Sequence, residues 1–237
     1  KEAIPQELIT TIHASLLKAV REDQITNKSR DLHLFPDGEI SSAHNLADYL
    51  VEYIGLIQLS NVRELIGKIY GKLSDAVFNS SYFAKPKLIG LETKPHQDNA
   101  FFCMSPPEIA TCWIPLSFAD TSNGGMYYFV GSHQAGNLPH EPEGNLGASM
   151  CINSEHIDAI ASRYYKQYIS IKAGDCILHN SLVVHGSNEN LSEFDRHAFN
   201  FSIGSANAVR NEDLFNQYQN KLNEYLKQKK SSDMLNP

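Results

Sequence analysis

The segment VFNSSYF, residues 77–83, begins a series of short β-type runs that continues to residue 204. Valine, isoleucine, threonine and aromatic residues are frequent in these runs, and Gly, Pro, Asn or Ser separates them. The other runs are 111–119 (TCWIPLSFA), 126–130 (MYYFV), 167–171 (QYISI), 176–179 (CILH), 182–186 (LVVHG) and 197–204 (HAFNFSIG). Strands this short, with turn signals between them, predict a β-sandwich or barrel and not alternating β-α-β units.

The region before these runs has the period of amphipathic helices. Apolar residues recur at helical spacing over 5–23, 44–55 and 61–73, which predicts three helices. The polar stretch 24–41 between the first two carries the turn signal Pro36-Asp37-Gly38. The first 73 residues are therefore predicted to be mostly helical.

Two further segments depart from the β pattern. Residues 132–165 contain several Gly and Pro residues and read as one long loop, which we expect to cover the mouth of a functional site. Residues 211–229 have leucine or tyrosine at every fourth position, from Leu214 to Leu226, which predicts a last helix. No repeat, low-complexity tract or linker divides the chain, so one domain is expected.

The bulk composition argues against several classes of function. With 237 residues and a net charge of −7, the chain has no basic stripe or arm, so we expect no nucleic-acid partner. No window approaches the roughly 20 apolar residues that a membrane span needs. The N-terminus shows no secretory leader, although the chain starts without Met. We expect no membrane partner and a cytoplasmic location with four reduced cysteines, and the oligomeric state is open.

Three residues form a candidate metal site. On a strand, His96 and Asp98 would face the same side because side chains alternate. His185 ends the apolar run 182–184 and could approach from a separate strand. Two imidazoles and one carboxylate on one face of a metal suit Fe(II) and leave positions open for further ligands. Zinc hydrolases typically use a helical HExxH motif, which is absent here.

His179 also lies at a strand end and is the main rival to His185. We prefer His185 because Gly186, Ser187 and Arg196 follow it in a meaningful arrangement. Six other histidines are interpreted as surface, turn or hydrogen-bonded core residues: His13, His33, His44, His133, His140 and His156.

Arg196 follows His185 by eleven positions, across a polar stretch of the kind that joins two antiparallel strands. The returning strand would bring Arg196 beside Ser187. A guanidinium binds a carboxylate in bidentate fashion, and a serine hydroxyl adds one donor. A dicarboxylate keto acid could therefore chelate the metal at one end and pair with Arg196 at the other.

Several short segments follow one another along the chain in the order given in the next sentence. They are Lys85-Pro86, His96-Gln97-Asp98, Cys112-Trp113-Ile114-Pro115-Leu116, Asn123-Gly124-Gly125, Gly131-Ser132-His133, Gly174-Asp175 and His185-Gly186-Ser187 ahead of Arg196. In these segments the chain resembles the phytanoyl-CoA dioxygenase family of Fe(II)- and 2-oxoglutarate-dependent oxygenases, which includes ectoine hydroxylase-like enzymes. One departure is Val130, where the family usually has Pro.

The resemblance implies a mainly β fold with flanking helices, the double-stranded β-helix (jelly roll, cupin-like barrel). Within a single domain 1–237, it places mostly helical support at 1–73, the jelly-roll core at 75–205 and a C-terminal helix at 211–229.

The resemblance also implies the roles of individual residues. Iron is held by His96, Asp98 and His185, and the far carboxylate of 2-oxoglutarate is held by Arg196 and Ser187. Three further residues are expected to line the cosubstrate pocket: Asn79, Ser81 and Trp113.

The implied activity is hydroxylation of a small-molecule metabolite with Fe(2+), O2 and 2-oxoglutarate, which is decarboxylated to succinate. The carboxylate of Asp98 favours hydroxylation over halogenation, because halogenases of this type replace it with a small residue. Phe101 and Phe102 are candidate substrate walls. The substrate is open among acyl-CoA thioesters, amino-acid derivatives, phosphonates and natural-product intermediates. The sparse Lys85, Lys87 and Lys94 make coenzyme A phosphates a poor match and favour a smaller metabolite.

Two other functions are considered. A degenerate jelly roll could bind metal or a small acid without turnover, but such a site is expected to have lost at least one member of the set. A cupin-like isomerase or zinc hydrolase predicts more His or Glu ligands close to His96, and none is present.

Overall fold

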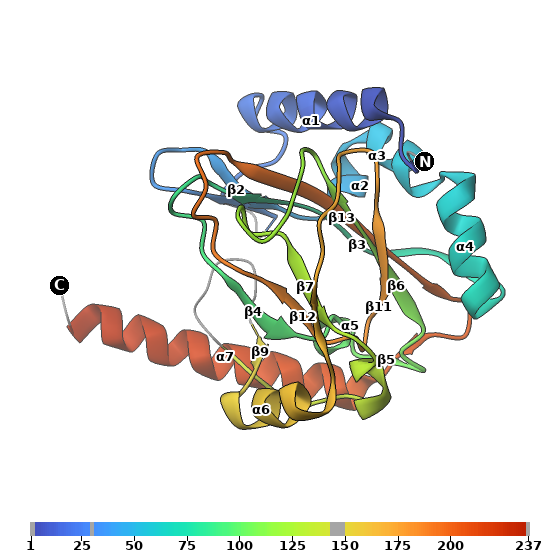
Figure 1. The fold of residues 1–237 in the computed structure, drawn as a ribbon. Coiled ribbons are helices and arrows are strands. Elements are labelled where there is room, and N and C mark those ends of the chain that lie inside the picture. The colour runs from blue at the N-terminus through green and yellow to red at the C-terminus, as the bar shows by residue number, and fades with distance from the viewer. Residues whose placement is uncertain (1–2, 29–30, 143–149, 236–237) are drawn as a thin grey trace.

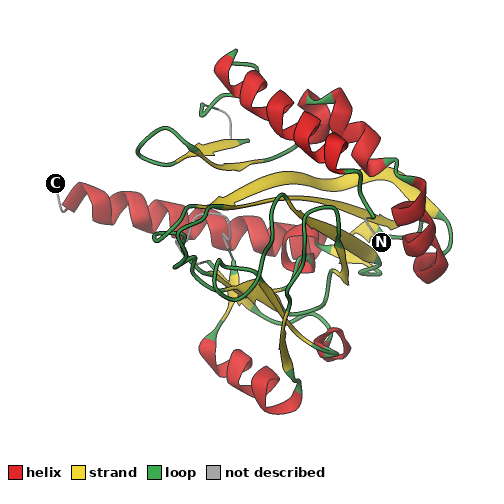
Figure 2. Cartoon of the chain, turned by 45° about the horizontal axis from the view of Figure 1, so that its top comes forward, coloured by secondary structure: helices red, strands yellow, loops and turns green. Residues whose placement is uncertain are grey.

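Two antiparallel β-sheets pack face to face, with helices on their outer surfaces (Figures 1 and 2). The computed structural model describes residues 3–28, 31–142 and 150–235. The larger sheet has the strand order β1-β2-β3-β13-β6-β11, and the smaller sheet has the order β10-β7-β12-β4. This arrangement is the predicted mainly β, double-stranded β-helix with flanking helices.

The strand bounds follow the sequence pattern closely. The larger sheet comprises β1 (Leu32–Leu34), β2 (Ile40–Ala43), β3 (Leu73–Lys85), β13 (Arg196–Ser205), β6 (Ile109–Pro115) and β11 (Ile177–Asn180). The smaller sheet comprises β10 (Lys166–Tyr168), β7 (Met126–Phe129), β12 (His185–Ser187) and β4 (Thr93–His96). Two short pairs lie outside these sheets, β5 (Met104–Ser105) with β14 (Val209–Arg210) and β8 (His140–Glu141) with β9 (Cys151–Ile152).

Helices cover both outer surfaces. The N-terminal helices are α1 (Gln6–Arg21), α2 (Leu46–Tyr49), α3 (Val51–Ile57) and α4 (Ser60–Tyr70), and they pack on the larger sheet. The remaining helices are α5 (Asn99–Phe102), the 3-10 turn η1 (Ser132–Ala135), α6 (Ser154–Arg163) and α7 (Glu212–Leu235). Apolar residues of α6 pack against the outer face of the smaller sheet.

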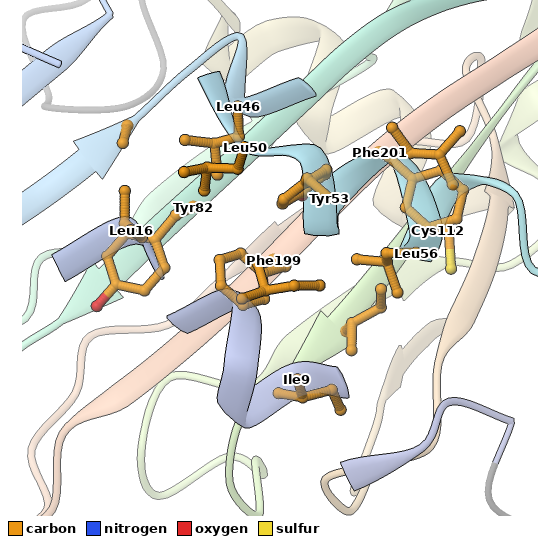
Figure 3. Packing of buried hydrophobic residues seen from close by; sticks show 14 of the residues in the cluster. Ile9, Leu16, Leu46, Leu50, Tyr53, Leu56, Tyr82, Cys112, Phe199 and Phe201 are labelled. Carbon is orange, nitrogen blue, oxygen red and sulfur yellow. The ribbon is translucent and has the colours of Figure 1, made fainter. Parts of the chain in front are cut away.

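Side-chain alternation on β13 separates the core from the cavity. Phe199 and Phe201 are fully buried against the N-terminal helices, where Tyr53 of α3 also lies (Figure 3). The alternate residues Ala198 and Asn200 face the space between the sheets. Because period-2 alternation places one set of side chains on each face, the same strand supplies both the hydrophobic core and the wall of an internal cavity.

Two predictions about the secondary structure were wrong in part. The polar stretch 24–41 was assigned a turn signal and no strand, but it includes β1 and the first half of β2, which form a hairpin at the edge of the larger sheet. The predicted loop 132–165 contains η1, β8, β9 and α6, and its residues 143–149 lie outside the described residues. Tertiary pairing gave these polar segments regular structure that their local pattern does not predict.

The predicted helices 5–23 and 211–229 correspond to α1 and α7. The predicted helix 44–55 is divided between α2 and α3, and 61–73 corresponds to α4. Within the described part of the chain, no helix is both long enough and apolar enough to cross a bilayer. That the chain forms a single domain stays a prediction.

We predict that Phe199→Ala lowers the free energy of unfolding by about 3–5 kcal/mol, because it removes a fully buried aromatic side chain and leaves a cavity. The matched control is Phe194→Ala, since Phe194 is 75% exposed, and its effect should stay within about 0.5 kcal/mol. Urea unfolding curves compare the two variants. Equal destabilisation by both would contradict the assignment of Phe199 to the core.

Candidate metal site and cavity

His96 and His185 face each other across a pair of antiparallel strands. His96 ends β4 and His185 begins β12, and the two residues are register partners. Their ring centroids are 4.4 Å apart. The expectation that His185 ends a strand of residues 182–184 was wrong, because Val184 precedes β12 and the strand starts at His185 itself. Strand pairing therefore brings the two imidazoles together.

Backbone carbonyl oxygens determine which ring nitrogen of each imidazole carries the proton. Nδ1 of His96 lies 2.8 Å from the carbonyl oxygen of Lys94, and Nδ1 of His185 lies 2.9 Å from that of Val183. A carbonyl can only accept, so each Nδ1 donates its proton and each Nε2 keeps its lone pair. The Nε2 atoms are thus oriented as metal ligands.

Asp98 completes the set, although not from a strand. We expected His96 and Asp98 to share one face of a strand, but β4 ends at His96 and Asp98 has helical backbone angles at the start of α5. Its Oδ1 lies 3.8 Å from Nε2 of His96 and 3.6 Å from Nε2 of His185. One donor atom from each residue lies within 4.8 Å of the other two.

The second oxygen of Asp98 is held by protein donors. Oδ2 accepts hydrogen bonds from Oγ1 of Thr111 at 2.6 Å and from Nε2 of His179 at 3.1 Å. Nδ1 of His179 lies 3.2 Å from the hydroxyl of Tyr128. The rival histidine therefore supports the carboxylate from behind, and Oδ1 remains directed toward His96 and His185. We infer that His179 positions a ligand and is not one itself.

Burial sets the protonation of this cluster. Desolvation lowers the pKa of His96, and it lowers the pKa of His185 well below its ordinary value. Desolvation alone would raise the pKa of Asp98, but His185 and the hydrogen bond from His179 lower it by more. Neutral imidazoles and an ionised carboxylate are the forms that bind a metal.

Two basic side chains lie together in the cavity. Arg196 begins β13 and is the register partner of Lys85 on β3. Arg196 is buried, its guanidinium lies 5.7 Å from the ring of Trp113, and its Nε has no hydrogen-bond partner. Among the described residues, no carboxylate forms an ion pair with Arg196. A buried cation in this situation requires an anion.

Lys85 was noted in the sequence only as a member of a sparse basic set, yet its side chain is buried. Its Nζ donates to the carbonyl oxygens of Asn188, at 2.6 Å, and Ser187, at 3.3 Å. Desolvation and the charge of Arg196 lower the pKa of Lys85 to about 6. Alternation along β3, which puts Lys85 on the same face as Asn79 and Ser81, is the sequence signal that could have identified it.

Ser187 and Arg196 do not lie on a hairpin, contrary to expectation. Ser187 belongs to β12 of the smaller sheet and Arg196 to β13 of the larger sheet, so the intervening segment crosses between the sheets. Both residues nevertheless line the same cavity, and Lys85 connects them through its bond to the Ser187 carbonyl.

One cavity of about 740 Å³ contains all of the predicted site residues. They are His96, Asp98, His185, Arg196, Ser187, Trp113, Asn79 and Ser81, together with the proposed walls Phe101 and Phe102. No described residue of 132–165 lines the cavity, and residues 143–149 lie outside the described part of the chain, so the cover stays a prediction. Residues of α7 lie at the cavity instead.

His44 and His140 are hydrogen-bonded, as expected, but His44 also lines the cavity and was missed. His140 accepts a hydrogen bond from the backbone N–H of Gln97, the residue between two of the candidate ligands. The set of two imidazoles and one carboxylate on one side of a metal fits Fe(II) and leaves the opposite face open.

The model of the Phytanoyl-CoA dioxygenase (PhyH) family matches residues 6–198. Phytanoyl-CoA dioxygenase 1 of Oryza sativa subsp. japonica is 31% identical over 147 residues, which is 61% of this chain and 50% of the relative. Phytanoyl-CoA dioxygenase of Arabidopsis thaliana is 33% identical over 129 residues, 54% of this chain and 44% of the relative. The chain thus spans about half the length of these relatives.

Solved structures share the fold at low identity. EctD from S. alaskensis, in a crystal structure with 2-oxoglutarate and 5-hydroxyectoine, has a TM-score of 0.67 and 16% identity, covering 85% of this chain and 69% of EctD. The non-heme monooxygenase ThoJ in its apo form has a TM-score of 0.66 and 18% identity, covering 88% of this chain and 74% of ThoJ. These similarities support the jelly-roll architecture.

We predict that His185→Ala abolishes stoichiometric Fe(II) binding, whereas His179→Ala keeps the metal with an affinity reduced by about 10- to 100-fold, as is typical when a supporting hydrogen bond is lost. Anaerobic titration with metal analysis of the desalted protein measures both variants. Retention of iron by His185→Ala together with its loss from His179→Ala would show that the roles of the two histidines are reversed.

Proposed function

The chain belongs to the phytanoyl-CoA dioxygenase family, and we propose that it is an Fe(II)- and 2-oxoglutarate-dependent dioxygenase that hydroxylates a small-molecule metabolite and decarboxylates 2-oxoglutarate to succinate. One observation carries the proposal. A complete set of His96, Asp98 and His185 shares a cavity with a buried arginine that lacks an anionic partner among the described residues. An enzyme that uses a dicarboxylate cosubstrate requires both features in one space.

The protein residues have distinct tasks in this proposal. His96, His185 and Oδ1 of Asp98 hold the metal, and Thr111 and His179 keep the carboxylate in its orientation. When bound, iron supplies the redox chemistry that couples O2 reduction and keto-acid decarboxylation to C–H oxidation. Arg196 binds the far carboxylate of 2-oxoglutarate, with Ser187 as a further donor.

The burial of Lys85 and Arg196 explains why water cannot solvate these basic groups adequately. Trp113 lies beside the guanidinium, and Lys85 and Arg196 are 5% and 3% exposed. Electrostatic interactions are strong in such a dry environment, so a carboxylate gains more there than it would at the surface. The cavity walls position the cosubstrate and keep bulk water away from the reacting atoms.

We predict that anaerobic addition of 2-oxoglutarate to the Fe(II)-loaded protein produces the visible charge-transfer band of a chelated keto acid. Arg196→Ala should need at least about tenfold more 2-oxoglutarate for the same band, since a charge-assisted contact contributes roughly 1.5–3 kcal/mol. Arg196→Lys is the matched control and should recover part of the affinity by keeping the charge. Absence of the band in metal-loaded wild type would overturn the proposal and favour a non-catalytic jelly roll that binds metal or a small acid.

We further predict that the affinity for 2-oxoglutarate falls as the pH rises above about 6. The pKa of Lys85 is about 6 in the structure, so its amine is neutral above this pH. Lys85 then takes up a proton when an anion binds beside it. Affinity should therefore change little below pH 6 and fall by at most about tenfold per pH unit above it. Anaerobic calorimetry in two buffers of different ionisation enthalpy measures the proton uptake. Lys85→Met should remove the uptake, and an unchanged uptake in this variant would contradict the assignment.

A further inference from the structure

Most of the residues that line the cavity are neither candidate metal ligands nor part of the Lys85–Arg196 pair. Among the described residues that line the cavity, those of the Asp, Glu, Lys or Arg type are Lys85, Asp98 and Arg196. The proposed function uses all three for the metal and the cosubstrate. The remaining lining is formed by aromatic, aliphatic, hydroxyl, amide and imidazole side chains. Among the described residues, a charged substrate group in this part of the cavity would have no counter-charge, and its desolvation would be costly.

One wall carries an ordered chain of uncharged hydrogen bonds. Nδ2 of Asn79 donates to Oδ1 of Asn200 at 3.1 Å, and Oγ of Ser81 donates to Oδ1 of Asn79 at 2.6 Å. Because the Ser81 hydroxyl proton is used in this bond, Ser81 Oγ accepts a hydrogen bond from Nδ1 of His44 at 2.9 Å. Nε2 of His44 then accepts the hydroxyl proton of Ser42 at 3.2 Å. Each proton in the chain has one assigned place.

This polar wall stays neutral at physiological pH. Burial lowers the pKa of His44 to about 4, so its imidazole does not carry a charge at pH 7. The groups that remain free to face a ligand are serine lone pairs and amide N–H donors, since the hydroxyl protons of Ser42 and Ser81 are in use. Such groups recognise hydroxyl, carbonyl or ether oxygens.

The apolar lining includes residues of the C-terminal helix, which passes beside α5 (Figure 1). Leu222, Tyr225 and Leu226 of α7 line the cavity, as do Phe101 and Phe102 of α5. These side chains come from segments far apart in the sequence and together offer a large hydrocarbon and aromatic surface.

Two contacts fix α7 in this place. Lys221 donates to the carbonyl oxygen of His140 at 3.0 Å and pairs with Glu141 at 2.8 Å. The ring of Tyr218 lies 6.1 Å from that of Phe101 in an edge-to-face arrangement. The helix is thus anchored one residue before Leu222, which defines how its side chain lies at the cavity.

We propose that the part of the substrate that enters this cavity is electrically neutral and amphipathic. Its hydrocarbon or aromatic body lies against Leu222, Tyr225 and Phe101, and its oxygen-containing groups lie against the Ser42–His44–Ser81 wall. Ser81, which the sequence placed at the cosubstrate, is thereby assigned to the substrate. Carboxylate, phosphate and ammonium groups are excluded from the inserted part. This inference rests on the proposed function, because it assumes that the metal and 2-oxoglutarate occupy the charged end of the cavity.

Three probes with the same adamantane body test the charge preference: 1-adamantanemethanol, 1-adamantanecarboxylate and 1-adamantanemethylamine, the last as its ammonium ion. They are titrated anaerobically into protein loaded with Fe(II) and saturating 2-oxoglutarate, so that Lys85 and Arg196 are not available to the carboxylate. Trp113 is the sole tryptophan of the chain and lines the cavity, so its fluorescence reports occupancy. Adamantane does not absorb in this range.

The alcohol should bind at least about tenfold more tightly than either charged probe, since a difference of 1.4 kcal/mol corresponds to a factor of ten. Equal or tighter binding of the carboxylate or the ammonium probe overturns the inference, and so does failure of all three to bind. The charge-transfer band is recorded on the same sample. A sample without the band shows failure of the proposed function, whereas a band without the preference shows failure of the inference alone.

A gain of binding tests the role of α7. Leu222→Lys should strengthen binding of the carboxylate probe by at least about tenfold, because it supplies the missing counter-charge inside the cavity. Asn223→Lys is the matched control, since Asn223 is exposed. This substitution adds the same charge one position along the helix. Equal strengthening by both variants would indicate long-range attraction and contradict contact between Leu222 and the substrate.

The polar wall is tested separately with His44→Phe, which keeps a ring of similar size and removes its hydrogen bonds. This variant should weaken binding of the alcohol probe by about fivefold, in keeping with the loss of one neutral hydrogen bond. Its Fe(II)–2-oxoglutarate band should be retained, which shows that the fold and the metal site are intact. Unchanged affinity for the alcohol would contradict the role of His44 in orienting the serine hydroxyls that face the substrate.

Discussion

The pairing of β4 with β12 is the interaction on which the site depends. It places His96 directly opposite His185, and each imidazole is then oriented by the same backbone contact, from Nδ1 to the carbonyl two residues earlier. Two soft torsions per side chain are thereby fixed without any charged partner. Asp98 only has to approach from the following turn to complete three donors on one side. The arrangement of the two candidate histidine ligands is a consequence of strand register.

The two carboxylate oxygens of Asp98 have different roles, because hydrogen bonds from the protein hold only one of them. Thr111 and His179 occupy Oδ2, which leaves Oδ1 for a metal. In the same cavity, strand pairing brings two basic side chains, Lys85 and Arg196, side by side. Burial and the charge of Arg196 lower the pKa of Lys85, because like charges opposite each other in a sheet are unfavourable. An anion bound beside both side chains would relieve this cost, which supports the proposed cosubstrate.

The helical layers allow the interior of the sandwich to remain hollow and polar. The larger sheet buries its outer aromatic side chains under α1, α3 and α4, and the smaller sheet is covered by α6. Most apolar burial therefore takes place outside the sandwich, and the space between the sheets is free to carry functional groups. The C-terminal helix α7 has a different task, because its apolar residues face the cavity and not the main core.

Residue type and spacing by themselves predicted most strands, a β-sandwich or barrel, and the set of His96, Asp98, His185 and Arg196, because alternation and ligand chemistry are local properties of a sequence. The jelly roll was implied by the family resemblance. They did not predict that Asp98 leaves the strand, that His179 holds its second oxygen, or that β1 and β2 form a hairpin. That Lys85, His44 and residues of α7 line the cavity was likewise identified only in the structure. Their roles arise from burial and from contacts between residues distant in the chain, and such contacts exist only after the sheets and helices have packed together.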